Sequence, residues 1–271
     1  MALLEAERVS LALPDRAAAP SFGAAPMTTI LDGIDLAVEP GESLGIVGES
    51  GSGKTSLGRT LLRLYRPTGG RLRFEGTDIT DLPEERLRPL RARMQFVFQD
   101  PLSSLNPRHR IEDILAQPLL AFDRVGSRAD GRQQAKALLE RVQLPASFAS
   151  RYPHELSGGQ RQRVGIARAI ALGPRLIVAD EIVSGLDVST QAHILALLRA
   201  LREQCALVFI SHDLSVVRVL CDRVLVLHRG KVVEAGPCAE IFAAPKHPYT
   251  ALLLASIPLP EVEPGWLAGA A

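Results

Sequence analysis

Residues 48–55 read Gly48-Glu49-Ser50-Gly51-Ser52-Gly53-Lys54-Thr55, and they follow an apolar run from Ser43 to Val47. Beyond them, Leu57, Leu61 and Leu64 recur with a spacing that would place them on one face of a helix. This order matches G-x-x-x-x-G-K-[ST], the phosphate-binding loop that joins a strand to a helix. Glycines let the backbone wrap around a phosphate, and the helix N-terminus directs N–H groups and partial positive charge toward it. The sequence therefore predicts a nucleotide site at residues 48–55.

Two side chains of this loop have predicted contacts with the nucleotide. Lys54 is expected to reach the β- and γ-phosphates, and the hydroxyl of Thr55 is expected to bind Mg²⁺. The alternative is a glycine-rich turn with no ligand. It is disfavoured because the strand and helix patterns flank the motif on the correct sides.

The overall composition narrows the class of protein. At 271 residues the chain is long enough for one large domain or for a core with a subdomain. A formal net charge of +1 gives no reason to expect a polyanionic partner, so nucleic acid is disfavoured. No apolar run approaches the roughly 18 to 20 residues that span a bilayer, and Met1 to Glu5 lack the pattern of a signal peptide. We therefore expect a chain that stays in the cytosol.

The three cysteines, Cys205, Cys221 and Cys238, are odd in number and far apart in the sequence. No Cys-x-x-Cys pair or Cys/His cluster surrounds them. This pattern favours buried free thiols over a disulfide framework or a zinc site.

Short strands are predicted on both sides of the phosphate-binding loop. Residues 4–13 alternate as a strand would, and residues 29–37 form a second strand after an Ala-, Pro- and Gly-rich loop at residues 14–26. Arg71 to Phe74, followed by Glu75-Gly76, indicates half of a hairpin. We expect these strands to be antiparallel.

The run Met94 to Arg108, MQFVFQDPLSSLNPR, resembles the Q-loop of the ATP-binding subunits of ABC transporters. Its continuation, Asp-Pro-x-x-Ser-Leu-Asn-Pro-Arg, resembles the oligopeptide, dipeptide and nickel importer branch of that family. Leu156 to Arg161 matches the family's LSGGQ signature, and it is also a glycine-rich helix start where phosphate could bind. Between these motifs, apolar positions such as Ala135 and Leu138 predict a mainly helical insertion from Ile111 to about Arg151.

After Arg175, the apolar run Leu176 to Ala179 ends in two acids, Asp180 and Glu181. Such a run favours a central parallel strand, whose carboxyl end is where ligands lie in open α/β sheets. By resemblance to the family's Walker B pair, Asp180 would hold Mg²⁺ and Glu181 would polarise the attacking water. The alternative, two acids that cap the following segment, does not explain the other motifs.

Residues 184–189 resemble the family's D-loop, which crosses the dimer interface, so Asp187 is expected near the nucleotide. Two neighbouring positions differ from the family's usual motif. Ile182 stands where the family usually has Pro, and Gly185 stands where this branch usually has Ala. These departures could alter the stiffness of the loop and the coupling between two sites.

A second buried strand, Ala206 to Ile210, ends at Ser211-His212-Asp213. Most single histidines are structural, but His212 resembles the family's H-loop histidine, which contacts the γ-phosphate and helps to align the water with Glu181. Gln99 of the Q-loop is expected to reach both Mg²⁺ and the γ-phosphate. The other histidines receive no such role.

The C-terminal part of the sequence also resembles the same branch. Residues 224–227 and 231–234 indicate a hairpin, and HPYTALLLASIP, His247 to Pro258, resembles the branch's short C-terminal extension. Some members continue into a cysteine-rich tail that binds an iron–sulfur cluster. No cysteine follows Cys238, so that cofactor is not expected.

Together, these motifs imply an α/β P-loop ABC ATPase. The resemblance divides the chain into residues 1–99 (an antiparallel β subdomain and the P-loop half of a RecA-like core), 100–162 (a helical subdomain that ends in the signature), 163–240 (the second half of the core) and 241–271 (the branch extension). The implied reaction is attack of water on the γ-phosphate of ATP.

The resemblance implies a full set of site residues. Glu181, His212 and Gln99 would be catalytic, and Thr55, Gln99 and Asp180 would hold Mg²⁺. The residues expected to contact ATP are Gly48, Glu49, Ser50, Gly51, Ser52, Gly53, Lys54, Thr55, Ser157, Gly158, Gly159, Gln160 and Asp187.

By the same resemblance, ATP would lie between the phosphate-binding loop of one subunit and residues 157–160 of a second ATPase subunit, identical or related. Two membrane permease subunits would dock near Gln99, and an extracytoplasmic binding protein would act indirectly. The chain would therefore be peripheral, at the cytoplasmic face of the inner membrane.

Other functions remain open at this stage. Peptide import comes first and nickel or metal-chelate import second, because the same ATPase motifs serve both. An ABC ATPase acting on nucleic acid or ribosomes predicts a coiled coil, a tandem cassette or a basic face, and a P-loop GTPase or kinase predicts Asn-Lys-x-Asp or a lid. Leu13, with Phe22 as a substitute, stands where the family usually stacks an aromatic residue on adenine.

Overall fold

A six-stranded sheet forms the centre of the computed structural model, which describes residues 2–15, 25–100 and 104–256. Its strand order is β10-β9-β3-β8-β7-β6. The strands are β3 (Ser43–Val47), β6 (Met94–Val97), β7 (Leu176–Asp180), β8 (Ala206–Ile210), β9 (Arg223–His228) and β10 (Lys231–Pro237). All neighbouring pairs are parallel except β9 and β10, which form an antiparallel hairpin.

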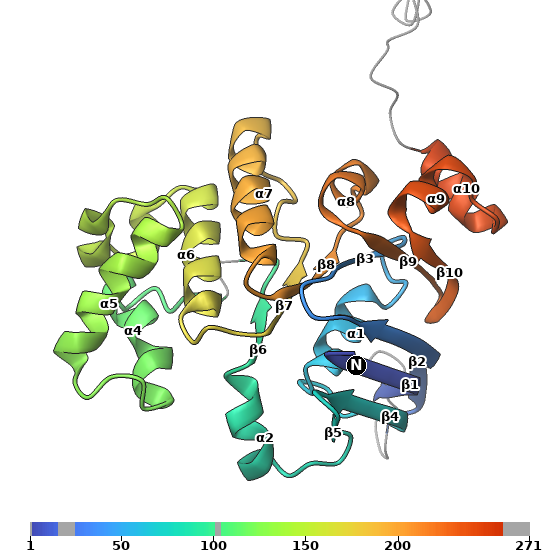
Figure 1. The fold of residues 1–271 in the computed structure, drawn as a ribbon, viewed down its shortest axis with the longest axis horizontal. Coiled ribbons are helices and arrows are strands. Elements are labelled where there is room, and N and C mark those ends of the chain that lie inside the picture. Colours follow the sequence, from blue (N-terminus) through green and yellow to red (C-terminus); the bar gives the residue numbers. More distant parts are fainter. Residues whose placement is uncertain (1, 16–24, 101–103, 257–271) are drawn as a thin grey trace, which may run out of the picture.

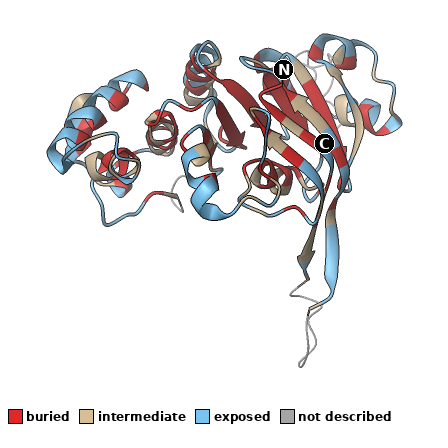
Figure 2. Ribbon diagram, turned by 60° about the horizontal axis from the view of Figure 1, so that its bottom comes forward, coloured by how far each residue is buried: buried red, intermediate tan, exposed pale blue. Residues whose placement is uncertain are grey.

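A second sheet, of order β2-β1-β4-β5, is antiparallel throughout. Its strands are β1 (Leu4–Pro14), β2 (Met27–Val38), β4 (Gly69–Phe74) and β5 (Thr77–Asp78). The predicted short antiparallel strands are thereby confirmed. The far ends of β1 and β2 project from the body of the molecule (Figure 2). Met27 to Thr29 of β2 are exposed there, and Ala12 and Leu13 of β1 are partly buried.

The helices lie on both sides of the central sheet and beyond its β6 edge. They are α1 (Lys54–Leu61), α2 (Glu84–Arg91), α4 (Ile111–Ala121), α5 (Arg128–Arg141), α6 (Gly158–Ile170), α7 (Val188–Arg202), α8 (Leu214–Leu220), α9 (Cys238–Ala243) and α10 (Pro248–Ala255). Two 3₁₀ turns, Ala146–Ser150 and Pro153–Glu155, precede α6. In Figure 1, α4, α5 and α6 gather at one end of the molecule, and α9 and α10 lie at the other. The predicted helical insertion is therefore present.

Burial on both faces explains the apolar character of the central strands. Every residue of β3, β7 and β8 is buried. Successive residues alternate between two cores: Leu176 and Val178 pack with α1 and the antiparallel sheet, whereas Ile177 and Ala179 pack with the helices on the other face. A side-chain period of two, with both faces covered, requires the continuous apolar runs seen in the sequence.

The helix after the phosphate-binding loop is shorter than the leucine spacing predicts. Leu57 and Leu61 are fully buried, but α1 ends at Leu61, and Leu64 is 44% exposed. Arg63 adopts a left-handed φ of 55°, which turns the chain out of the helix before Leu64. The expectation that all three leucines lie on one face of a helix was wrong for Leu64, which lies beyond the end of α1.

Two further expectations concern the thiols and the membrane. Cys205, Cys221 and Cys238 are free and buried, as predicted. Burial raises the pKa of all three thiols, to about 11 for Cys205 and for Cys238, so they remain protonated at neutral pH. Across residues 2–15, 25–100 and 104–256, no helix combines the length and the apolar character needed to cross a bilayer.

Candidate ATP site

The phosphate-binding loop leaves the carboxyl end of β3 and leads into α1. Gly48, Gly51 and Gly53 adopt positive φ values of 151°, 79° and 104°. A Cβ atom added to Gly48 would lie 2.1 Å from the backbone oxygen of Leu227, and one added to Gly53 would lie 3.1 Å from that of Ile30. All three glycines are therefore favoured by backbone conformation, and at Gly48 there is also no space for a side chain.

Lys54 crosses the loop that precedes it. Its Nζ donates hydrogen bonds of 2.8 Å to the carbonyl oxygens of Gly48 and Glu49. Burial lowers the pKa of this ammonium, while the nearby carboxylates of Glu181, Asp180 and Glu49 act in the opposite direction. The cation is thus held inside the curve of the loop, where the motif predicts phosphate.

Thr55 and Asp180 meet beside the loop, although they come from α1 and from the end of β7. The hydroxyl of Thr55 donates to Asp180 Oδ1 over 3.1 Å. Asp180 is only 2% exposed, and burial raises its pKa, as does the neighbouring Glu181; the Thr55 bond partly opposes this shift. A buried carboxylate beside a hydroxyl is a set of hard oxygen donors that fits Mg²⁺.

The described residues hold no group of three or more His, Cys, Asp and Glu side chains placed to bind a metal ion. This finding agrees with the usual habit of Mg²⁺, which takes one or two carboxylates and completes its shell with other oxygen donors, phosphate oxygens and water. Asp180 would supply the carboxylate, and Thr55 and Gln99 would supply neutral oxygen ligands.

Two catalytic candidates converge on a carboxylate oxygen of the third. Gln99 Nε2 donates to Glu181 Oε2 over 3.0 Å, and Nδ1 of His212 lies 3.4 Å from the same oxygen. The residues follow β6, β7 and β8, which are neighbours in the parallel part of the sheet, so their carboxyl ends open on one edge. The structure brings together all three predicted side chains.

The backbone of Glu181 is itself unusual. It adopts a left-handed φ of 48°, and its N–H donates to the carbonyl of Ile210 at the end of β8. A non-glycine residue in this region costs free energy; such residues are enriched at functional sites but also end helices, as Arg63 does. The strand end therefore fixes the direction of the Glu181 side chain.

The signature residues begin α6. Ser157 is the N-cap: its Oγ accepts from the N–H of Gln160, and Gln160 Oε1 accepts from the N–H of Ser157 over 2.9 Å. A Cβ atom on Gly159 would lie 2.0 Å from the Thr190 methyl group of α7. The helix start is therefore pressed against the start of α7, with room only for glycine.

Asp187 occupies the N-cap of α7. Its Oδ1 accepts from the N–H of Thr190 over 2.9 Å, and the hydrogen bonds of Thr190 hold the pKa of this carboxyl below its ordinary value. Within one chain, then, Asp187 caps its own helix. Gly185 just before it has a left-handed φ of 72°, which accounts for glycine at that position, and Ile182 is buried in the core.

The predicted site residues form two groups, which adjoin at a hollow of about 330 Å³ that both Gln99 and Gly158 line. Gly48 to Thr55, Gln99, Asp180, Glu181 and His212 share the carboxyl edge of the central sheet. Within the part of the chain that the structure describes, no hydrogen bond or ion pair joins residues 157–160 or Asp187 to the phosphate-binding loop.

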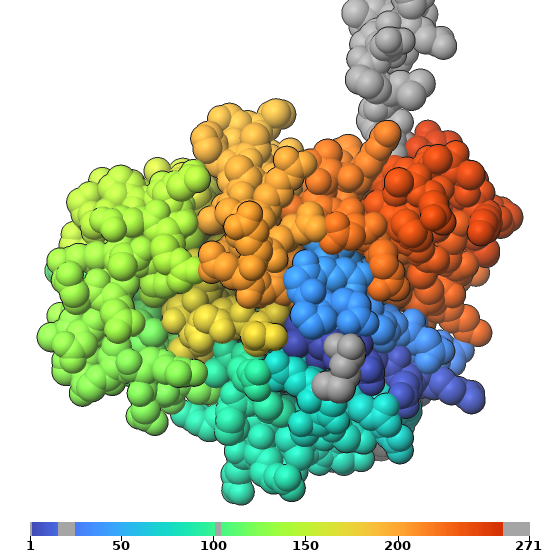
Figure 3. Space-filling model, viewed as in Figure 1, coloured from blue at the N-terminus to red at the C-terminus, as the bar shows by residue number. Residues whose placement is uncertain are grey.

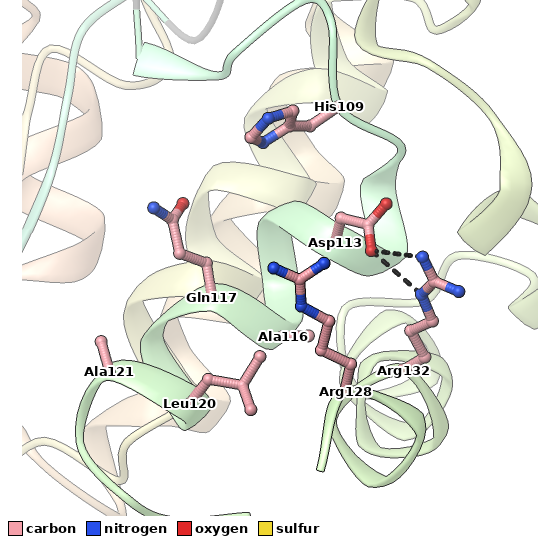
Figure 4. Close-up of a pocket in the computed structure, with 8 residues that line it drawn as sticks. All are labelled: His109, Asp113, Ala116, Gln117, Leu120, Ala121, Arg128 and Arg132. Carbon is pink, nitrogen blue, oxygen red and sulfur yellow. Dashed lines mark hydrogen bonds and ion pairs between the residues drawn. The ribbon is translucent and has the colours of Figure 1, made fainter.

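Among the hollows of the described residues that lie outside this site, two adjoin the helical end of the molecule. One, of about 640 Å³, is lined by Phe98, by Arg59 of α1 and by Arg168 of α6, so it lies where α1, the β6 edge of the sheet and α6 meet. The other, of about 520 Å³, lies between α4 and α5 (Figure 4). There Asp113 pairs with Arg132 over 2.9 Å. Neither hollow contains a predicted nucleotide contact.

Sequence reasoning missed two side chains that adjoin the loop. The hydroxyl of Tyr249, in α10, accepts a hydrogen bond from the N–H of Glu49 over 3.0 Å. The ring of His228 stacks on Tyr249 with centroids 3.9 Å apart. The HPYTALLLASIP motif marked the branch but gave no signal that this segment returns to the nucleotide site.

Of the two candidates for the adenine contact, the structure describes one. Leu13 lies partly buried in β1 and pairs with Thr28 of β2. Phe22 lies outside the described residues.

Comparisons with known proteins agree with these motifs. A family model described as "ABC transporter" matches residues 31–184, and one described as "Oligopeptide/dipeptide transporter, C-terminal region" matches residues 233–270. The oligopeptide transport ATP-binding protein AppF of Bacillus subtilis is 51% identical over 232 residues, which cover 84% of this chain and 70% of AppF. A putative peptide import ATP-binding protein of Brucella ovis is 49% identical over 234 residues, covering 86% of this chain and 74% of the relative.

A solved structure extends the likeness to three dimensions. It is the dimeric, post-hydrolysis state of an ATP-binding cassette bound to ADP and Pi, with a TM-score of 0.77 and 29% sequence identity. The match covers 87% of this chain and 98% of that chain.

Proposed function

This chain belongs to the ABC transporter family of ATP-binding proteins, and from that premise we propose that it is the ATPase subunit that powers an importer of di- and oligopeptides. The convergence of Gln99 and His212 on Glu181, beside the Thr55–Asp180 pair, is the observation that carries the ATPase assignment. The peptide cargo is supported by the C-terminal family match and by relatives that are named for peptide import.

The proposed chemistry follows from the positions of these side chains. Lys54, held inside the loop, would bind the β- and γ-phosphates. Glu181 would accept a hydrogen bond from the attacking water, and His212 would help to orient that water and contact the γ-phosphate. Since Gln99 Nε2 already donates to Glu181, its Oε1 is the atom left for Mg²⁺. Mg²⁺ bound by Thr55, Asp180 and Gln99 would neutralise charge on the phosphates.

We propose that a second ATPase subunit completes the site. Residues 157–160 and Asp187 would contact ATP bound to the partner's loop, which agrees with their separation from the loop of their own chain. Val188, next to Asp187, is an apolar residue that is 82% exposed, as expected for a surface that another subunit covers. The partner would be a second copy or a related ATPase.

The remaining parts of the assembly also follow the family. We propose the division into residues 1–99, 100–162, 163–240 and 241–271. The hollow between Phe98 and α6 would receive a cytoplasmic segment of one of two permease subunits, which would hold the chain at the cytoplasmic face of the inner membrane. A binding protein outside the membrane would deliver the peptide.

The cargo assignment is tested by uptake in cells that carry the native permeases. Labelled di- and oligopeptides are compared with Ni²⁺ in cells with wild-type or Glu181→Gln protein, and a permease deletion gives the background. We expect loss of peptide uptake with Ni²⁺ uptake unchanged. Loss of Ni²⁺ uptake alone would overturn the peptide assignment in favour of metal import. Peptide uptake that persists in the variant but not in the permease deletion would contradict the role of this chain as a required motor.

A further inference from the structure

The C-terminal helix α10 returns to the phosphate-binding loop. The contact joins Tyr249 to Glu49, which are 200 positions apart in the sequence, through a 3.0 Å hydrogen bond from the Glu49 N–H to the Tyr249 hydroxyl oxygen. Figure 3 shows the orange and red C-terminal part of the chain adjoining the blue N-terminal part on the surface. The contact therefore links the most distant part of the described sequence to the nucleotide site.

Tyr249 is held firmly by its surroundings. Its ring is 9% exposed and stacks on His228, the last residue of β9, at an interplanar angle of 15°. His247 Nδ1 accepts from the Tyr249 N–H over 3.1 Å and caps α10. The carboxylate of Glu234 in turn accepts from the N–H groups of Lys246 and His247. The hydroxyl is therefore a fixed acceptor anchored on the β9–β10 hairpin.

The group that Tyr249 contacts is one whole peptide unit of the loop. The peptide between Gly48 and Glu49 uses its N–H for Tyr249, and its carbonyl oxygen accepts from Lys54 Nζ over 2.8 Å. The orientation of one peptide plane thus links the tyrosine on the outer side of the loop to the lysine on the inner side. Rotation of that plane would break both hydrogen bonds.

We propose that Tyr249 is a positioning residue for nucleotide binding, which fixes the Gly48–Glu49 peptide and through it the place of Lys54. This inference rests on the proposed binding of ATP by the loop. A loop held in the binding conformation binds more tightly than one that visits it part of the time, because the apparent Kd is the intrinsic Kd divided by the competent fraction. Tyr249 raises that fraction.

The test removes the hydroxyl alone. Tyr249→Phe keeps the ring on His228, and Ser256→Ala is the matched control, because Ser256 in the same C-terminal segment donates its hydroxyl only to the Leu253 carbonyl, over 2.6 Å. Loss of one partly buried hydrogen bond predicts an increase of about two- to tenfold in the Kd for ATP with Tyr249→Phe. Ser256→Ala is expected to bind as the wild type does. In steady-state hydrolysis, KM should rise with kcat unchanged.

A double variant tests the route through Lys54. In a Lys54→Ala background, adding Tyr249→Phe should weaken ATP binding by less than twofold, because the lysine that the peptide positions is gone. A Kd for Tyr249→Phe equal to that of the wild type would overturn the inference, and so would equal losses in the two backgrounds. Failure of the wild-type protein to bind ATP would instead refute the proposed function.

Discussion

Asp180→Asn should make the protein more stable while it removes the response to Mg²⁺. Asp180 is 2% exposed, and burial raises its pKa. A carboxyl whose folded-state pKa exceeds its unfolded value holds its proton more tightly in the native state. The destabilisation that this carboxyl causes therefore grows as pH rises from the unfolded-state pKa to the folded-state pKa, and it is fully present at neutral pH. Asparagine removes the charge and keeps an oxygen that can accept from Thr55.

The expected gain in the free energy of unfolding follows from the burial of Asp180. An incompletely paired buried polar or charged group costs about 1–3 kcal/mol in protein mutational series. At pH 7.5 and without nucleotide, Asp180→Asn should have a free energy of unfolding that exceeds the wild-type value by that amount. Each kcal/mol corresponds to an increase of about 2–4 °C in Tm. The advantage should shrink as pH is lowered toward about 4, where the unfolded carboxyl takes up its proton.

Urea denaturation at several pH values measures this difference, and melting with ATP plus Mg²⁺ or ATP plus EDTA measures the metal response. The wild type should melt higher with Mg²⁺, and Asp180→Asn should not distinguish the two conditions. Asp187→Asn is the control. The pKa of Asp187 is held below its ordinary value by hydrogen bonds, so its charged form stabilises the fold and its replacement should lower stability. Asp180→Asn less stable than the wild type at pH 7.5, or with an intact Mg²⁺ response, would refute the reasoning.

Three other substitutions give distinct results. Lys54→Ala should raise the Kd for ATP about ten- to a hundredfold, since a charged donor is lost. Calorimetric titration measures this Kd, and an unaltered value would contradict the assignment of Lys54 to the phosphates. Gly48→Ala would place a Cβ 2.1 Å from the Leu227 oxygen, so it should lower the free energy of unfolding by about 1–3 kcal/mol; an unchanged urea midpoint would show that the site accommodates it. His212→Ala removes a side chain that is 56% exposed, so it should leave Tm unaltered and lower kcat about 10²- to 10³-fold, and a kcat within threefold of the wild type would remove His212 from the site.

Local sequence patterns predicted those parts of the fold that local chemistry determines. The loop of residues 48–55 needs glycines between a strand and a helix, and Leu176 to Asp180 needs apolar residues because both faces of β7 are covered. Those requirements are readable in one stretch of sequence. The end of α1 could not be predicted in this way. The leucine spacing continues to Leu64, but the chain leaves the helix before it, where Arg63 adopts a left-handed conformation.

The site itself was predicted by resemblance more than by pattern. Gln99, Glu181 and His212 meet because β6, β7 and β8 are neighbours in the sheet, and strand order is not encoded in any one of those segments. The contact of Tyr249 with Glu49 is long-range in the same sense, since the two residues are 200 positions apart in the sequence. Periodicity along the chain carries no information about such pairs.

The central claim is that Glu181 directs the attack of water on ATP bound at this loop, and Glu181→Gln tests it most directly. Glutamine keeps the shape of the side chain but cannot act as a base, and general-base catalysis contributes about 10²- to 10⁴-fold. The purified variant should bind ATP within about twofold of the wild type, release γ-phosphate about 10²- to 10⁴-fold more slowly, and accumulate as an ATP-bound dimer in light scattering. Phosphate release at the wild-type rate would contradict the account.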